Sequence, residues 1–144
     1  MTVQKPNPML VLSSCSYILP CIVCYSVGQP VLAILYGAVI VVSSIYHATK
    51  NPALLWLDVP LAHIGHLLTL AFIVKGGWWS MPAYFAWLTY AVTAYYYGQR
   101  TQTLIWDPDV DRATPWHMGL HSLTSLCTAY TVFVTAQVEQ HAPV

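Results

Sequence analysis

The stretch that decides the fold is MLVLSSCSYILPCIVCYSVGQPVLAILYGAVIVVSSIYH, residues 9–47, which contains no charged residue. The uncharged run extends from Lys5 to Lys50, and a helix needs about 20 mainly apolar residues to cross a bilayer. Gly28-Gln29-Pro30 interrupts the run with residue types that favour a turn. The stretch therefore predicts two membrane-spanning helices, at about residues 9–25 and 31–47.

The rest of the chain has the same character. Of its 144 residues, 57% are hydrophobic and only 7% are charged, whereas a soluble domain carries roughly 25% charged residues. We therefore expect an all-α integral membrane helical bundle, with a single transmembrane domain over residues 1–144. Its expected spans, about five, lie at about 9–25, 31–47, 54–74, 78–97 and 115–138. A net charge of zero offers no basic surface for nucleic acid, so the expected partner is the lipid bilayer, and the oligomeric state stays open.

Five polar residues stand out in these apolar segments: Ser43, His47, Asp58, His117 and His121. Residues four apart lie on one face of a helix, so Ser43 is placed next to His47, and His117 next to His121. If the spans alternate in direction, the end of the second and the starts of the third and fifth lie at the same membrane surface. The five side chains are therefore expected to lie at a similar depth. Ionisable groups inside membrane segments indicate a functional site.

Basic residues indicate which surface this is. Lys5, Lys50, Arg100 and Arg112 fall on the side of the polar group, and Lys75 alone falls on the other side. Loops that face the cytoplasm carry an excess of lysine and arginine. We therefore expect the N-terminus and the polar group on the cytoplasmic side of the membrane.

The polar group has the composition of a metal site. Three imidazoles, from His47, His117 and His121, would leave the fourth position of a zinc ion open for water, as in catalytic zinc sites. Zinc lowers the pKa of its bound water to about 7. The Asp58 carboxylate can take the proton of that water and hand it to a leaving group. Ser43 can bond a carbonyl oxygen, bond a developing oxyanion or orient the water, and the sequence does not separate these roles.

Other interpretations of the histidines stay open. A lone membrane histidine often makes only a helix–helix hydrogen bond. His63 and His66, deeper in the third span, could line a substrate cavity, join the metal site or bond hydroxyl groups, and we favour roles other than ligation. Either one could instead hold haem together with a histidine of another helix. A non-catalytic, receptor-like membrane protein with a structural zinc is a further alternative, whereas a di-iron lipid hydroxylase needs more than the six histidines present.

Three motifs resemble the CREST superfamily of membrane zinc hydrolases: SSIYHAT at residues 43–49, LDVP at 57–60 and HMGLH at 117–121. That superfamily includes the alkaline ceramidases, the progestin and adiponectin receptors and a group of GPI-remodelling proteins. Its signature is Ser-x-x-x-His on one helix, Asp on the next and His-x-x-x-His on the last. The gap between His47 and Asp58, and the Asp-x-Pro that follows, are most similar to the alkaline ceramidase branch.

The resemblance implies a zinc-dependent hydrolase that cleaves a lipid amide or ester bond, with ceramide or a phospholipid as substrate. It implies His47, His117 and His121 as zinc ligands, with Asp58 and Ser43 as catalytic residues around the water. The chain departs from the family in having room for about five spans where the family usually has seven. Its first residues also lack the acidic calcium motif of the alkaline ceramidases, so we expect a shortened form without a calcium requirement.

Overall fold

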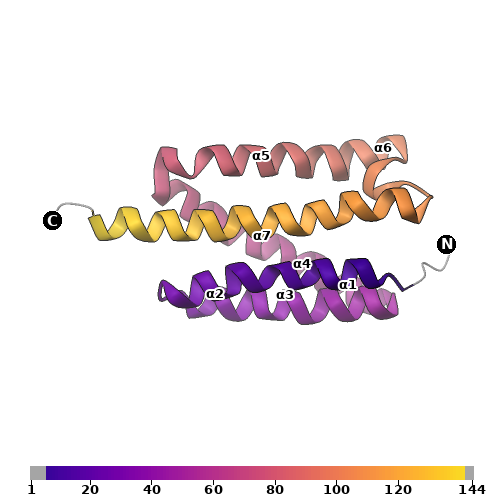
Figure 1. The fold of residues 1–144 in the computed structure, drawn as a ribbon, viewed down its shortest axis with the longest axis horizontal. Helices are drawn as coiled ribbons and strands as arrows, with labels where there is room; N and C mark the ends of the chain where they lie inside the picture. Colours follow the sequence, from indigo (N-terminus) through magenta and orange to yellow (C-terminus); the bar gives the residue numbers. More distant parts are fainter. Residues whose placement is uncertain (1–5, 142–144) are drawn as a thin grey trace.

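A computed structural model describes residues 6–141, and this range contains helices and turns but no strand. The long helices alternate in direction, and all but α4, which crosses obliquely behind α7, lie along the long axis of the molecule (Figure 1). In chain order the elements are α1 (Pro8–Ser14), η1 (Cys15–Tyr17), α2 (Ile18–Ser26), α3 (Pro30–Thr49), α4 (Pro52–Gly76), η2 (Gly77–Trp79), α5 (Met81–Ala91), η3 (Val92–Tyr97, a π-helix), α6 (Gly98–Thr101), η4 (Leu104–Trp106) and α7 (Val110–His141). The all-α prediction is confirmed. Lys5, which entered the orientation argument, lies outside the described residues.

Three helical runs in the described part of the chain are long and apolar enough to cross a membrane: Pro8–Ser26, Pro30–Thr49 and Pro52–Trp79. They match the first three predicted spans and indicate a membrane protein. Many of their large apolar side chains face outward, for example Val31 at 75% and Ile34 at 74% exposure. An apolar exterior of this kind fits a bilayer rather than water.

The fourth and fifth predicted spans correspond to α5 with η3, and to α7, which are not among those three runs. In α7 one reason is its inward face, which buries a row of hydroxyl side chains. These hydroxyl residues are Thr124, Ser125, Thr128, Thr131 and Thr135. Hydroxyls lower the hydropathy of α7, although they can be satisfied inside the bundle by backbone carbonyls.

Particular residues set the turns between the first helices. Gly28 follows α2 with a φ of +75°, a conformation that favours glycine. Pro30 and Pro52 stand in the first turns of α3 and α4, where the missing N–H has no intrahelical partner to lose. Lys50 ends α3 in the left-handed conformation, and the Asn51 side chain then caps α4. The predicted spans 31–47 and 54–74 therefore lie within α3 and α4.

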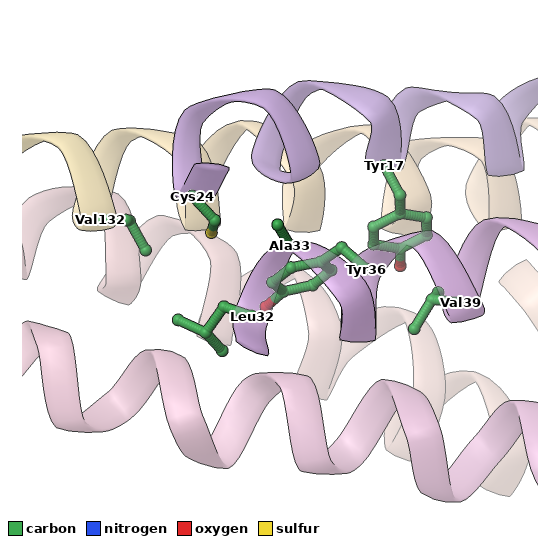
Figure 2. Close-up of a cluster of buried hydrophobic side chains, with 7 residues drawn as sticks. All are labelled: Tyr17, Cys24, Leu32, Ala33, Tyr36, Val39 and Val132. Atoms are coloured by element: carbon green, nitrogen blue, oxygen red, sulfur yellow. The ribbon is translucent and has the colours of Figure 1, made fainter. Parts of the chain in front are cut away.

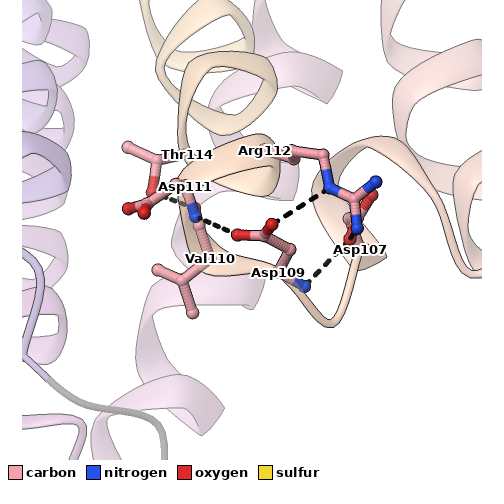
Figure 3. A network of polar contacts seen from close by, with 6 residues as sticks. All are labelled: Asp107, Asp109, Val110, Asp111, Arg112 and Thr114. Atoms are coloured by element: carbon pink, nitrogen blue, oxygen red, sulfur yellow. Dashed lines mark hydrogen bonds and ion pairs between the residues drawn. The ribbon is translucent and has the colours of Figure 1, made fainter.

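The start of α7 differs from the prediction. The sequence predicts a helix that begins near Pro115, but α7 begins at Val110. The Asp109 side chain accepts a hydrogen bond from the backbone N–H of Asp111 at 3.0 Å, and Arg112 pairs with Asp109 at 3.2 Å (Figure 3). These contacts satisfy backbone groups that a helix start otherwise leaves free. The acidic loop, rather than the proline, therefore sets the beginning of the helix.

The centre of the bundle is held by buried side chains from η1, α2, α3 and α7: Tyr17, Cys24, Leu32, Ala33, Tyr36, Val39 and Val132 (Figure 2). The Tyr36 hydroxyl lies 3.1 Å from the Gly65 carbonyl oxygen and 2.9 Å from Thr69 Oγ1, both on α4. It also lies 3.5 Å from Thr128 Oγ1 on α7. Buried polar groups in a bilayer must be paired within the protein. Tyr36 therefore joins α3 to the two helices beside it.

Two helical glycines provide a matched test of this packing. A Cβ atom at Gly98 would lie 2.7 Å from the Thr103 carbonyl oxygen and 3.2 Å from the Leu104 Cβ, whereas a Cβ at Gly37 would meet nothing within 4 Å. We expect Gly98→Ala to destabilise the protein by about 1–3 kcal/mol through overpacking. Gly37→Ala should be neutral or should stabilise by up to about 1 kcal/mol through helix propensity. Thermal unfolding of both variants in detergent checks this, and an equal effect of the two would contradict the described turn after α6.

Candidate metal centre

The three predicted histidine ligands meet in space. The ring centroids of His47 and His117 are 4.9 Å apart, those of His117 and His121 are 4.8 Å apart, and those of His47 and His121 are 5.4 Å apart. One nitrogen of each ring lies within 4.8 Å of the corresponding nitrogen of the other two. The sequence motifs on α3 and α7 therefore converge on one point.

The alternation of the helices explains this convergence. α3 ends, and α4 and α7 begin, at the same end of the bundle, where α1 also begins (Figure 1). His47 is in the last turn of α3, and His117 with His121 occupies one face near the start of α7. His47 is 0% and His121 is 6% exposed, and His117 is half-buried. The group is thus enclosed on one side and accessible on the other.

The donor set and its spacing fit a zinc ion. Nitrogens bound to tetrahedral zinc at 2.0–2.1 Å lie about 3.4 Å from one another. The ring nitrogens, within 4.8 Å of one another, lie near that spacing. His47 Nε2 is buried and, among the described residues, has no hydrogen-bond partner. A buried polar atom without a partner is costly, and a metal ion would satisfy it.

Asp58 and Ser43 lie beside this group. Ser43, one turn before His47 on α3, is 1% exposed, and Asp58 is half-buried in the second turn of α4. The Asp58 side chain is next to the Ser43 hydroxyl and near Lys50. Asp58 does not belong to the group of atoms close enough to share an ion with the histidines. This placement suits a residue that acts on a water or a substrate rather than a ligand.

Lys50 was not expected at the site. Its Nζ lies 3.2 Å from His47 Nδ1 and 5.1 Å from the centre of the Tyr46 ring. Burial lowers the pKa of the Lys50 ammonium, and the Asp58 carboxylate opposes that shift. In the sequence, Lys50 comes three residues after His47, at the end of the predicted second span. That position indicated only the orientation of the protein in the membrane. Lys50 adds a positive group at the rim of the site.

The first helix also contributes residues that the sequence analysis did not include. Ser13 Oγ lies 2.9 Å from His121 Nδ1, and Ser14 Oγ lies 3.1 Å from Ser43 Oγ. Both serines are buried, and the nearby Tyr17 ring lies 5.7 Å from the His121 ring. In the sequence, these two residues appear only as a Ser-Ser pair inside an apolar span. Whether they face the histidines depends on the rotation of α1 about its own axis, which the sequence does not give.

The remaining histidines of α4 lie outside the group. His63 is exposed on the outer face, and its Nδ1 lies 2.7 Å from the Val59 carbonyl oxygen of the same helix. His66 packs against Trp87 of α5, with ring centroids 4.4 Å apart. Neither ring approaches another histidine in the way that His47, His117 and His121 do.

The structure brings together the five residues that the sequence singled out. Three imidazoles from two helices converge, and a carboxylate and a hydroxyl stand beside them. A search of family models, of curated proteins and of solved structures found no match to the chain.

Proposed function

We propose that this protein is a membrane-embedded, zinc-dependent hydrolase that cleaves an amide or ester bond of a lipid such as ceramide or a phospholipid. The observation that carries the proposal is the convergence of His47, His117 and His121, with nitrogens within 4.8 Å of one another. Three imidazoles with an open fourth position are the ligand set of a catalytic zinc. The motif resemblance to the CREST superfamily supports the same assignment, in a shortened form.

The proposal includes the membrane arrangement. α5 with η3, and α7, would complete a bundle of about five spans, because α7 packs against α2 and α4, and α5 in turn packs against α7 (Figure 1). Lys50, Arg100 and Arg112 would then lie at the surface that holds the site, and Lys75 at the opposite one. The positive-inside rule places the site on the cytoplasmic side.

Each residue of the site has a distinct task in hydrolysis. His47, His117 and His121 would hold the zinc ion, which supplies an acidified water and polarises a carbonyl when bound. Asp58 would accept a proton from the attacking water and deliver it to the departing amine or alcohol as the bond to the acyl carbon breaks. Ser43 would donate a hydrogen bond to the carbonyl oxygen or orient the water, and its contact with Asp58 is compatible with either role.

Metal analysis of detergent-purified protein, paired with mass spectrometry of a mixed ceramide and phospholipid extract, tests the function. We expect one zinc ion per chain and the release of fatty acid from one lipid class. Zinc at full occupancy without turnover of any lipid would favour the receptor-like alternative. A haem absorption band in place of zinc would favour the bis-histidine haem protein.

Zinc affinity is expected to depend on pH. An imidazole binds metal only when it is neutral, so protons compete with zinc for all three ligands. Affinity should therefore be constant at neutral pH and fall only in strong acid, because charging an imidazole that is buried in the bundle is costly. Competition with a chelator from about pH 8 down to about pH 3 measures this effect, after correction for protonation of the chelator. Affinity that stays flat down to about pH 3 would argue for a ligand set other than histidine.

A further inference from the structure

We propose that Ser13 of α1 is a positioning residue of the metal centre, which holds the His121 ring with its proton on Nδ1 and leaves Nε2 free to bind the ion. The inference rests on the proposed zinc site and adds a third helix to it. It concerns the hydrogen bond behind the ligand, and such bonds commonly fix the orientation and the tautomer of a metal-bound histidine.

The contact itself carries the assignment. Ser13 Oγ lies 2.9 Å from His121 Nδ1, and both residues are 6% exposed. Ser13 Oγ also donates to the Leu10 carbonyl oxygen, 3.0 Å away on the same helix. A serine hydroxyl has only one hydrogen, so when it is given to Leu10 the oxygen can only accept from His121. His121 Nδ1 then carries the proton, and Nε2 presents a lone pair.

The packing of α1 keeps the serine in this place. The Asn7 backbone N–H donates to the His47 carbonyl oxygen at 3.1 Å, and Asn7 Nδ2 donates to Thr114 Oγ1 at 2.7 Å. The same side chain caps α1, because it accepts from the backbone N–H of Met9 at 3.0 Å. The start of α1 is thus joined to α3 at His47 and to α7 at Thr114, one turn before His117. This arrangement sets the register of α1 relative to both ligand-bearing helices.

Ser14 provides an internal comparison. It is also buried, and its Oγ likewise lies near the Leu10 carbonyl oxygen, at 2.9 Å. Its other contact, however, is with Ser43 and not with a histidine. Two neighbouring serines of equal size and similar burial therefore differ in whether they touch a zinc ligand. If α1 contributed only packing, removal of either hydroxyl would have the same effect on the metal.

The test is the zinc dissociation constant of the full-length protein, measured by chelator competition for the wild type, Ser13→Ala, Ser14→Ala and Ser13→Thr. We expect Ser13→Ala to weaken zinc binding by about 10–100-fold. Ser14→Ala should leave it within about twofold, and Ser13→Thr, which keeps the hydroxyl, should restore most of the loss. Equal affinities for Ser13→Ala and the wild type would overturn the inference. Failure of the wild type to bind zinc would instead overturn the proposed function.

A second measurement needs no variant and so remains decisive if Ser13→Ala does not fold. In a spectrum of the zinc-loaded wild type labelled with ¹⁵N-histidine, His121 can be assigned through its contact with the Tyr17 ring. A proton on Nδ1 of this ring is the expected result. A proton on Nε2 with zinc bound through Nδ1 would show that Ser13 does not hold the ring in the proposed way.

Discussion

Replacement of His117 by alanine is expected to reduce bound zinc from one ion per chain to background. The ring of His117 lies 4.9 Å from that of His47 and 4.8 Å from that of His121, and so forms the third corner of the group. Without it only two imidazoles remain, and a protein zinc site ordinarily uses at least three protein ligands. His117 makes no protein hydrogen bond among the described residues, so no other polar contact explains why its ring faces the other two.

His66→Ala is the matched control for this experiment. His66 is also a half-buried histidine of a membrane helix, but it packs on Trp87 and not on the group of three. Zinc content measured by mass spectrometry of the purified variants should therefore stay at one ion per chain in His66→Ala. Unchanged zinc in His117→Ala would show that this residue is not a ligand. Loss of zinc in both variants would point to general unfolding, which a thermal scan of each sample would reveal.

Asp58→Asn is expected to keep zinc and to lose hydrolysis. Asparagine has nearly the same shape as aspartate, but its amide cannot take up the proton of the attacking water. General acid–base groups typically contribute 10²–10⁴-fold to a rate, so turnover should fall by about that factor. Zinc occupancy should be preserved, because Asp58 does not belong to the group of atoms that could share the ion.

The control for Asp58→Asn is Asp111→Asn, an equal change in charge at an exposed residue in the first turn of α7. Turnover of the preferred lipid and zinc content are measured on the same preparations. Equal turnover in Asp58→Asn and the wild type would remove Asp58 from the mechanism. Loss of zinc together with turnover would instead make Asp58 a ligand, or a residue needed for the fold.

The arrangement of the histidines was accessible from the sequence because two simple periodicities decide it. The spacing of four puts His117 and His121 on one face of a helix. The even number of predicted spans between Asp58 and His117 would return the chain to the same end of the bundle, and in the structure α4 and α7 do begin at one end (Figure 1). Both inferences depend only on the positions of the uncharged segments, which Lys50, Lys75 and the acidic loop mark clearly.

The parts that the sequence did not predict depend on helix rotation and on local capping. Ser13 could be recognised only once α1 was placed between α3 and α7, because an apolar span gives no strong signal for which face turns inward. The predicted start of α7, near Pro115, was wrong because the cap formed by Asp109 lets the helix begin earlier, at Val110. A proline near a helix start removes one hydrogen bond but does not by itself prevent the helix from starting earlier.

The proposed function requires one ion held by three imidazoles, and X-ray absorption at the zinc edge measures this directly. The purified wild-type protein should show a four-coordinate zinc with three nitrogen neighbours and one oxygen neighbour at about 2.0–2.1 Å. Sulfur neighbours at about 2.3 Å would show that cysteines bind the metal instead. That result, or the absence of zinc above background, would contradict the proposed centre at His47, His117 and His121.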